Sequence, residues 1–245
     1  MSFELICGIH AVWGRLKKYP ASIVEIYLLQ TRQDKRILEL QTAAALQNIP
    51  IVFRSHPELD KMCSAVSHQG VAAKAETVSL PAHIDDVLDA LAEPALLLVL
   101  DGVQDPHNLG ACLRSADACR AHALIVPKDR AVGLTPAVRK VACGAAESIP
   151  FFAVTNLART LRELKDRGIW VLGTAAEGAQ ELGTIGLKGP VAWVLGAEGE
   201  GLRRLTRETC DELIRIPMMG AVESLNVSVA VGICLFETRR QRRVA

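Results

Sequence analysis

Apolar residues recur with two different periods along the first third of the chain. Helical spacing predicts helices over residues 8–18, 34–48 and 56–66. Segments rich in β-branched and aromatic residues predict strands over residues 22–30, 50–55 and 70–75. We interpret these six elements as a small α/β domain at residues 1–75, followed by a linker at 76–88 that contains proline and several polar residues.

The remainder of the chain alternates more regularly between short apolar runs and amphipathic segments. The runs predict strands over residues 95–102, 123–127, 149–155, 170–174, 192–199 and 212–217. Helices are predicted over residues 108–122, 135–148, 156–168 and 201–210 and from 227 towards the C-terminus. Strands that alternate with helices are typical of a parallel sheet, so residues 89–245 are expected to form a second α/β domain.

Composition and charge add little to the prediction of two α/β domains. Half of the 245 residues are hydrophobic and the net charge is +1, which excludes a disordered chain. The balance of charges gives no overall attraction to nucleic acid, so any RNA-binding face has to come from local clusters.

The seven cysteines are scattered, with no C-x-x-C pair and no zinc spacing. We therefore expect small buried apolar side chains in a reducing compartment, with no disulfide and no metal. The N-terminus has no basic segment followed by an apolar stretch, and the apolar runs at 95–100 and 227–236 are too short to cross a bilayer. We expect a soluble cytoplasmic protein with no membrane partner.

Ligands of open parallel sheets bind at the carboxyl ends of the strands. The first loop at such a position, 101–110, is rich in glycine, proline and asparagine. Asn108 suits the N-cap of the next helix, which is the simpler of its possible roles. Arg114 is either a solvated surface charge or an anion clamp near the helix N-terminus, because its planar guanidinium binds phosphate oxygens bidentately.

Two more loops follow later strands. Residues 196–201 hold three glycines around Glu198, and they form either a flexible turn or a close backbone approach to a ligand. Their order is not G-x-G-x-x-G, which argues against a nicotinamide dehydrogenase. The apolar residues 216–219 either line an adenine pocket or pack in the core. At the start of the last helix, Ser224 suits the N-cap, or Ser224 and Asn226 both face the pocket.

Together these loops are more specific than any one of them. The chain resembles the SpoU (TrmH) branch of the SPOUT RNA methyltransferases in three consecutive motifs, D-G-V-x-D-P-x-N-L-G-A-x-x-R-S-A-D, L-G-x-E-G-x-G and I-P-M-x-G-x-x-x-S-L-N-V-S-x-A. This resemblance covers residues 95–240. The front of the chain resembles the L30e-like substrate-binding domain of the same family. The opening G-I-H-A-V, the segment H-Q-G-V-A-A and the block P-K-D-R…V-A-C-G-A-A-E-S-I-P resemble the members of this branch that methylate a 23S rRNA guanosine.

The resemblance implies a reaction, in which S-adenosylmethionine methylates a ribose 2′-hydroxyl of RNA. The three blocks that resemble the 23S rRNA members imply a guanosine in the peptidyl-transferase P loop of 23S rRNA as the target. The catalytic residues that the family motifs imply are Asn108, Arg114, Glu198, Ser224 and Asn226. The implied cofactor-binding residues are Thr174, Gly196, Ile216, Met218 and Leu225. The family also implies a deep C-terminal trefoil knot and a homodimer, neither of which the strand pattern predicts.

Arg114 is expected to act as a clamp. The family proposal makes this arginine the general base, but a guanidinium has a pKa above ~12 and a neighbouring phosphate raises that pKa further. We therefore expect Arg114 to hold the substrate phosphate, with Asn108, Glu198 and Asn226 orienting Arg114 and the cofactor. The candidates for further RNA contacts are the N-terminal domain and four cations, each of which alone is more often a plain surface charge: Lys128, Arg130, Arg139 and Lys140. Arg239–Arg243 are expected to be a solvated helix end.

Two other functions fit parts of the sequence. A tRNA ribose methyltransferase of the same family would share all three motifs. A non-catalytic RNA-binding module would need only the front domain, and it would neither bind a cofactor nor depend on Arg114.

Overall fold

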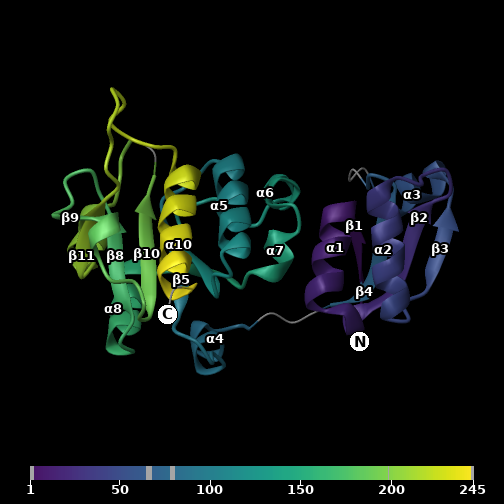
Figure 1. The fold of residues 1–245 in the computed structure, drawn as a ribbon, viewed down its shortest axis with the longest axis horizontal. Helices are drawn as coiled ribbons and strands as arrows, with labels where there is room; N and C mark the ends of the chain where they lie inside the picture. The colour runs from purple at the N-terminus through teal and green to yellow at the C-terminus, as the bar shows by residue number, and fades with distance from the viewer. Residues whose placement is uncertain (1–2, 65–67, 78–80, 198, 244–245) are drawn as a thin grey trace. The chain divides into compact units, whose positions relative to one another are not determined.

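The computed structural model describes residues 3–64, 68–77, 81–197 and 199–243 (Figure 1). The chain divides into two compact units. The first comprises Met1–Leu80 with Cys143–Ser148, and the second comprises Pro81–Ala142 with Ile149–Ala245. Each unit has a sheet and a hydrophobic core of its own.

The first unit contains a four-stranded sheet in the order β1-β4-β2-β3. Strand β4 is antiparallel to both β1 and β2, whereas β2 and β3 are parallel. The strands are β1 Phe3–Cys7, β2 Ile23–Leu29, β3 Ile51–Arg54 and β4 Val71–Glu76. The helices are α1 Ile9–Lys18, η1 Pro20–Ser22, α2 Lys35–Leu46, α3 His56–Cys63 and α7 Ala145–Ser148. All six elements predicted here are present, and β1 and η1 are additions. Residues 65–66, at the end of the helix predicted over 56–66, lie outside the described residues.

Both faces of this sheet are covered. Apolar residues of α1 and α2, among them Val12 and Leu40, pack with Ile26 and Ala73 of the strands. On the other face α3 contributes Leu59, which packs with Tyr27 of β2. The alternation of side chains along each strand supplies both layers.

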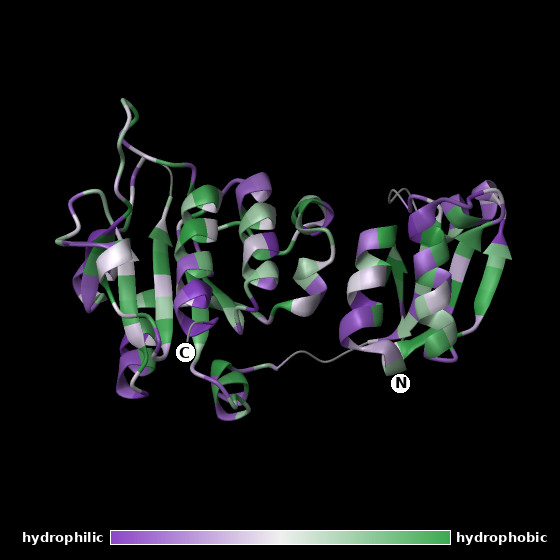
Figure 2. Cartoon of the chain, viewed as in Figure 1, coloured by the Kyte–Doolittle hydropathy of each residue, from purple (hydrophilic) through white to green (hydrophobic). Residues whose placement is uncertain are grey.

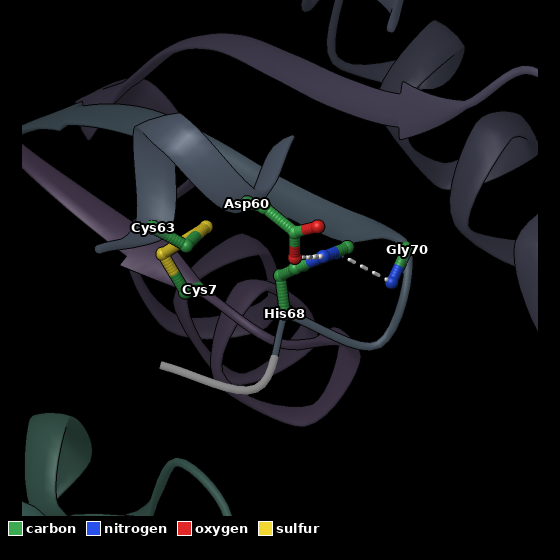
Figure 3. Close-up of a disulfide and its surroundings, with 5 residues drawn as sticks. All are labelled: Cys7, Asp60, Cys63, His68 and Gly70. Carbon is green, nitrogen blue, oxygen red and sulfur yellow. Dashed lines mark hydrogen bonds and ion pairs between the residues drawn. A yellow bond between two sulfur atoms is a disulfide. The ribbon is translucent and has the colours of Figure 1, made fainter. Parts of the chain in front are cut away.

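A turn centred on His68 leads into β4 (Figure 3). The His68 Nδ1 atom accepts a hydrogen bond of 3.0 Å from the backbone N–H of Gly70. Gln69 and Gly70 have φ angles of 47° and 71°, a left-handed conformation that glycine adopts at little cost. The H-Q-G part of the front motif therefore forms a tight turn.

The expectation about cysteines is wrong for one pair. Cys7 of β1 and Cys63 of α3 form a disulfide, with 6.1 Å between their Cα atoms (Figure 3). Cys143 is exposed, while Cys112 and Cys234 are buried thiols as expected. Spacing could not predict the pair, because 56 residues separate its members in sequence and the packing of α3 on the sheet brings them together.

The second unit contains a seven-stranded sheet in the order β7-β6-β5-β10-β8-β11-β9, with every paired strand parallel. The α/β fold class and the parallel sheet are thus confirmed. The strands are β5 Leu96–Asp101, β6 Ala123–Pro127, β7 Phe151–Val154, β8 Trp170–Thr174, β9 Gln180–Glu181, β10 Val191–Gly196 and β11 Glu212–Arg215. The two-residue strand β9 is additional to the prediction.

Helices cover both faces of this sheet. They are α4 Ile84–Asp89, α5 Pro106–Ala118, α6 Pro136–Ala142, α8 Leu157–Asp166, η2 Leu182–Thr184, α9 Arg204–Thr209 and α10 Val227–Arg243. Leu161 of α8 and Val87 of α4 belong to one core cluster with Val99 and Val194. Helices α5 and α10 lie side by side (Figure 1), and Trp193 of β10 donates a hydrogen bond of 2.9 Å to Thr238 of α10. Strand β10 is coloured mainly as hydrophobic in Figure 2, in keeping with burial on both faces.

Two segments differ from the predicted pattern. The single helix expected over residues 135–148 is divided into α6 and α7, because Cys143 and Gly144 have φ angles of 53° and 94°. Within the stretch 76–88 expected as a linker, α4 begins at Ile84 and places Val87 in the core of the second unit.

The expectation of a solvated helix end over Arg239–Arg243 is only partly right. Arg240 and Arg243 are exposed, whereas Arg239 and Arg242 bind neighbouring loops. Arg239 donates to the carbonyl oxygens of Cys119 and Arg120 and to the carboxylate of Glu93. Arg242 donates to four backbone carbonyl oxygens, those of Pro94, Ala95, Leu187 and Gly189. These two side chains fasten the end of α10 to neighbouring loops. Among the described residues, no helix combines the length and apolarity needed to cross a membrane.

Candidate functional site at the strand ends

The three predicted loops and Thr174 follow four neighbouring strands of the second sheet, β5, β10, β11 and β8. Gly196 at the end of β10 pairs with Asp101 at the end of β5, and Thr174 at the end of β8 pairs with Ile214 of β11. Because all four strands are parallel, their carboxyl ends meet at one edge. The structure therefore gathers there the loops that contain the predicted site residues.

Asn108 and Asn226 lie in direct contact, although 118 residues separate them in sequence. The Nδ2 atom of Asn226 donates a hydrogen bond of 2.9 Å to Oδ1 of Asn108. Asn108 is not the N-cap of α5: Asp105 is, and it accepts a hydrogen bond of 3.0 Å from the N–H of His107. The side chain of Asn108 is thus available for Asn226.

Helix α10 is capped by Asn226 and not by Ser224. The Oδ1 atom of Asn226 accepts hydrogen bonds from the N–H and the hydroxyl of Ser228, at 2.9 and 2.6 Å. The cap turns the amide group so that its nitrogen faces Asn108. Ser224 precedes this cap and is exposed.

In the glycine loop, residues 196–201, two backbone segments approach each other closely. A Cβ atom on Gly196 would lie 2.1 Å from the carbonyl carbon of Gly201, so no larger residue fits there without a shift of the backbone. The N–H of Gly201 donates to the carbonyl of Ala197 at 2.9 Å and closes the loop. Gly199 and Gly201 have φ angles of 83° and 65°. Glu198 lies outside the described residues.

The apolar residues after β11 are not part of the core. Ile216, Met218 and Leu225 are each partly exposed, and Met219 is 93% exposed. Thr174 is likewise partly exposed at the end of β8. These side chains are available to an apolar ligand, and core packing does not explain the run.

The basic candidates are all on the surface of the second unit. Arg114 is exposed on α5, and no hydrogen bond or ion pair to another described residue fixes its guanidinium. The other candidates are also exposed: Lys128, Arg130, Arg139 and Lys140. An arginine that is not held by protein groups can be ordered by a phosphate.

Three arginines that were not predicted from the sequence bind the loops of the site and hold them in place. Arg203 binds the buried carboxylate of Asp101, Arg207 pairs with Glu177 after β8, and Arg215 donates to the carbonyl of Gly178 and to Glu181. No local motif marks these residues, because each contact joins segments that are distant in sequence. The one sequence feature that indicates any of these contacts is the position of Asp101, directly after an apolar strand.

A group of potential metal ligands lies in the first unit. His56, Asp60 and His68 place ligand atoms within 4.8 Å of one another. His56 and His68 hydrogen-bond to Asp60 at 2.8 and 3.0 Å, and these bonds lower the pKa of that carboxyl group. Because His68 Nδ1 accepts from Gly70, its proton resides on Nε2, which faces Asp60. A metal would need the lone pair at Nε2, so the hydrogen bonds oppose metal binding there.

A hollow of about 680 Å³ lies away from these loops, between α4, β7 and α8. Phe151, Leu164 and Arg167 are among its lining residues. Arg167 pairs with Asp85 there. Of the predicted site residues that the structure describes, none lines this hollow.

Both parts of this chain match known protein families. The profile of the SpoU rRNA Methylase family matches residues 95–236, and that for RNA 2′-O ribose methyltransferase substrate binding matches residues 5–81. The 23S rRNA (guanosine-2′-O-)-methyltransferase RlmB of Ralstonia nicotianae is 56% identical, over 98% of this chain and 97% of its own. The protein of the same name from Nitrosomonas europaea is also 56% identical, over 97% of this chain and 92% of its own.

Solved structures agree in fold. An RNA 2′-O ribose methyltransferase is 27% identical, with a TM-score of 0.73 over 98% of this chain and 89% of its own. The SpoU methyltransferase AviRb of Streptomyces viridochromogenes, in complex with AdoMet, is 24% identical, with a TM-score of 0.72 over 99% of this chain and 92% of its own. The chain belongs to the SpoU rRNA methylase family.

Proposed function

We propose that this protein transfers a methyl group from S-adenosylmethionine to the ribose 2′-hydroxyl of a guanosine in 23S rRNA, in the peptidyl-transferase P loop. The support is the 56% identity, over nearly the whole chain, to proteins named for methylation of a 23S rRNA guanosine. The contact between Asn108 and Asn226 carries the structural side of the proposal, since it unites two separate family motifs in one site.

The loops at the strand ends fit S-adenosylmethionine. The close approach at Gly196 fixes the path of the loop backbone, and the partly exposed Ile216, Met218 and Leu225 offer an apolar surface to an adenine. We assign the cofactor to these residues, with Thr174 at the end of β8. The bound sulfonium supplies an electrophilic methyl group, and AdoMet is bound by a protein of the same fold.

Arg114 is the phosphate clamp in this proposal. Its exposed guanidinium binds a phosphate of the RNA and stabilises the charge that develops on the 2′-oxygen. Asn108 and Asn226 orient the reacting groups, together with Ser224 and Glu198. Holding the two reactants in line accounts for much of the expected rate. A guanidinium does not give up its proton near neutral pH, so we do not assign Arg114 as the base.

The test is methylation of unmodified 23S rRNA with labelled S-adenosylmethionine, followed by mapping of the 2′-O-methyl group. We expect one modified guanosine, and we expect Arg114→Lys to lose most activity because an ammonium cannot bind bidentately. Arg159→Ala is the control, since Arg159 is exposed on α8 and pairs with Glu163. Activity of Arg114→Lys equal to the wild type would refute the clamp.

A tRNA substrate is the second candidate. It is favoured by the likeness of 62% of this chain to a TrmH/SpoU tRNA modifying enzyme of A. aeolicus, at 30% identity and a TM-score of 0.56. Parallel reactions with tRNA decide between the two substrates. No label in either RNA would leave the non-catalytic RNA-binding module.

We also propose a homodimer in which a second copy covers α10. Val229 and Phe236 lie seven residues apart on that helix and are 50% and 63% exposed. Side chains seven apart share one helical face, so α10 presents an apolar strip. Phe236→Glu is expected to shift the mass in light scattering from dimer to monomer. Leu46→Glu, at a 77% exposed position of α2, is expected to leave the mass unchanged.

For the chain as a whole, we propose an L30e-like substrate-binding domain at residues 1–75, a linker that begins at residue 76 and ends before α4, and a methyltransferase domain that includes α4 and continues to residue 245, in a cytoplasmic enzyme. The trefoil knot expected from the family stays a prediction. Limited proteolysis checks the division, with cleavage expected before α4 because Val87 is packed in the second core.

A further inference from the structure

A buried carboxylate lies beneath the proposed cofactor loop. The side chain of Asp101, the last residue of β5, is 0% exposed, in line with the apolar residues before it. Its Oδ1 atom accepts from Nε and Nη2 of Arg203 at 2.6 and 2.5 Å, and its Oδ2 atom accepts from the backbone N–H of Arg203 at 3.0 Å. A buried charge without such partners would be costly.

The same aspartate holds the other end of the loop. The carbonyl oxygen of Asp101 accepts a hydrogen bond of 3.1 Å from the N–H of Ala197. Ala197 lies at the start of the glycine loop and Arg203 lies just beyond its end. Asp101 therefore binds both ends of a segment whose glycines have little conformational preference of their own.

We propose that Asp101 and Arg203 are positioning residues for S-adenosylmethionine binding. The ion pair holds the loop after β10 in the conformation that accepts the cofactor. Asp101 is buried and acts through the loop, without touching a ligand. An ion pair serves this purpose better than an apolar contact, because its forked hydrogen bonds are directional. The inference rests on the proposed assignment of the cofactor to the loop that begins at Gly196.

Two conservative variants test the pair without leaving an uncompensated buried charge. Arg203→Lys keeps a positive charge but loses the fork, and Asp101→Asn keeps the shape but turns an amide N–H towards the N–H of Arg203. Arg204→Ala is the matched control, because the neighbouring Arg204 is 84% exposed and pairs with Glu208 of its own helix. Binding of S-adenosylmethionine is measured by calorimetry, and KM and kcat are measured for both substrates.

Both variants are expected to raise the Kd and the KM for S-adenosylmethionine about tenfold, while kcat at saturating cofactor and the KM for rRNA change less than about twofold. Arg204→Ala should match the wild type. Variants with a lower melting temperature but unchanged cofactor affinity would show a merely structural pair and overturn the inference. A loss confined to kcat, or an equal loss of affinity in Arg204→Ala, would also overturn it.

Gly196→Val separates this inference from the assignment of the site. If that variant binds the cofactor as tightly as the wild type, the site assignment fails, and the inference fails with it. If Gly196→Val loses binding while Arg203→Lys and Asp101→Asn retain it, only the positioning role is refuted.

Discussion

Asn226 caps α10 and also contacts Asn108, and two substitutions separate these roles. Asn226→Ala removes the acceptor for the Ser228 N–H and the donor to Asn108 together. Asn226→Asp keeps an oxygen for the cap, which aspartate forms as well as asparagine does, but loses the donor. The aspartate variant therefore disturbs the proposed active site while it preserves the start of the helix.

The expected magnitudes follow from these contacts. Loss of an N-cap costs about 1 kcal/mol, and loss of a neutral hydrogen bond costs about 1 kcal/mol more. Asn226→Ala should lower the unfolding free energy by about 2 kcal/mol, which in a unit of this size corresponds to a fall of roughly 4–8 °C in melting temperature. Asn226→Asp should stay within about 1 kcal/mol of the wild type, since it retains the cap.

Circular dichroism melting and rRNA methylation provide the two readouts. We expect Asn226→Asp to lose at least about tenfold in kcat/KM with a small change in melting temperature. Asn156→Asp is the matched control for a charge added at a cap, because Asn156 caps α8 outside the proposed site and accepts from the N–H of Arg159. If Asn226→Asp methylates as fast as the wild type, the contact between the two asparagines plays no part in the reaction. An unchanged melting temperature for Asn226→Ala would refute the cap.

Three further predictions concern stability. Reducing the Cys7–Cys63 disulfide, which closes a loop over a separation of 56 residues, should lower the unfolding free energy by up to about 4 kcal/mol, and equal denaturation midpoints with and without reductant would contradict this. Arg239 lowers the pKa of Glu93 from 4.5 to about 2, so the stabilisation is complete above pH 4.5 and is lost as the pH falls towards 2; melting curves of Glu93→Gln should lack this acid-dependent loss. Arg242→Met should cost roughly 2–3 kcal/mol in urea titrations, since four carbonyl oxygens lose a charged donor, and a cost near zero would mean that water replaces it.

Local patterns predicted most of the secondary structure. The apolar run before Asp101 indicates a strand buried on both faces, and the alternation of strands and helices indicates a parallel sheet. Periodicity is weak in short elements, which explains why the five-residue β1 and the two-residue β9 were missed. It also cannot reveal a left-handed pair such as Cys143 and Gly144, which divides one expected helix into two.

The capping alternatives that the sequence offered for Asn108 and Ser224 are wrong for a related reason. Asn108 and Ser224 are good cap formers, but Asp105 and Asn226 occupy the caps. Several polar residues compete at each helix start, and the position where the chain leaves the sheet decides among them.

The sequence by itself determined the fold class, the family and the three loops that carry its motifs, because each of these depends on residues that are close together in the chain. Only the tertiary structure decided which side chains meet. The contacts of Asn108 with Asn226, of Asp101 with Arg203 and of Cys7 with Cys63 join segments 118, 102 and 56 residues apart. Such pairs depend on the order of strands and on the packing of helices across them, and local sequence carries no information about either.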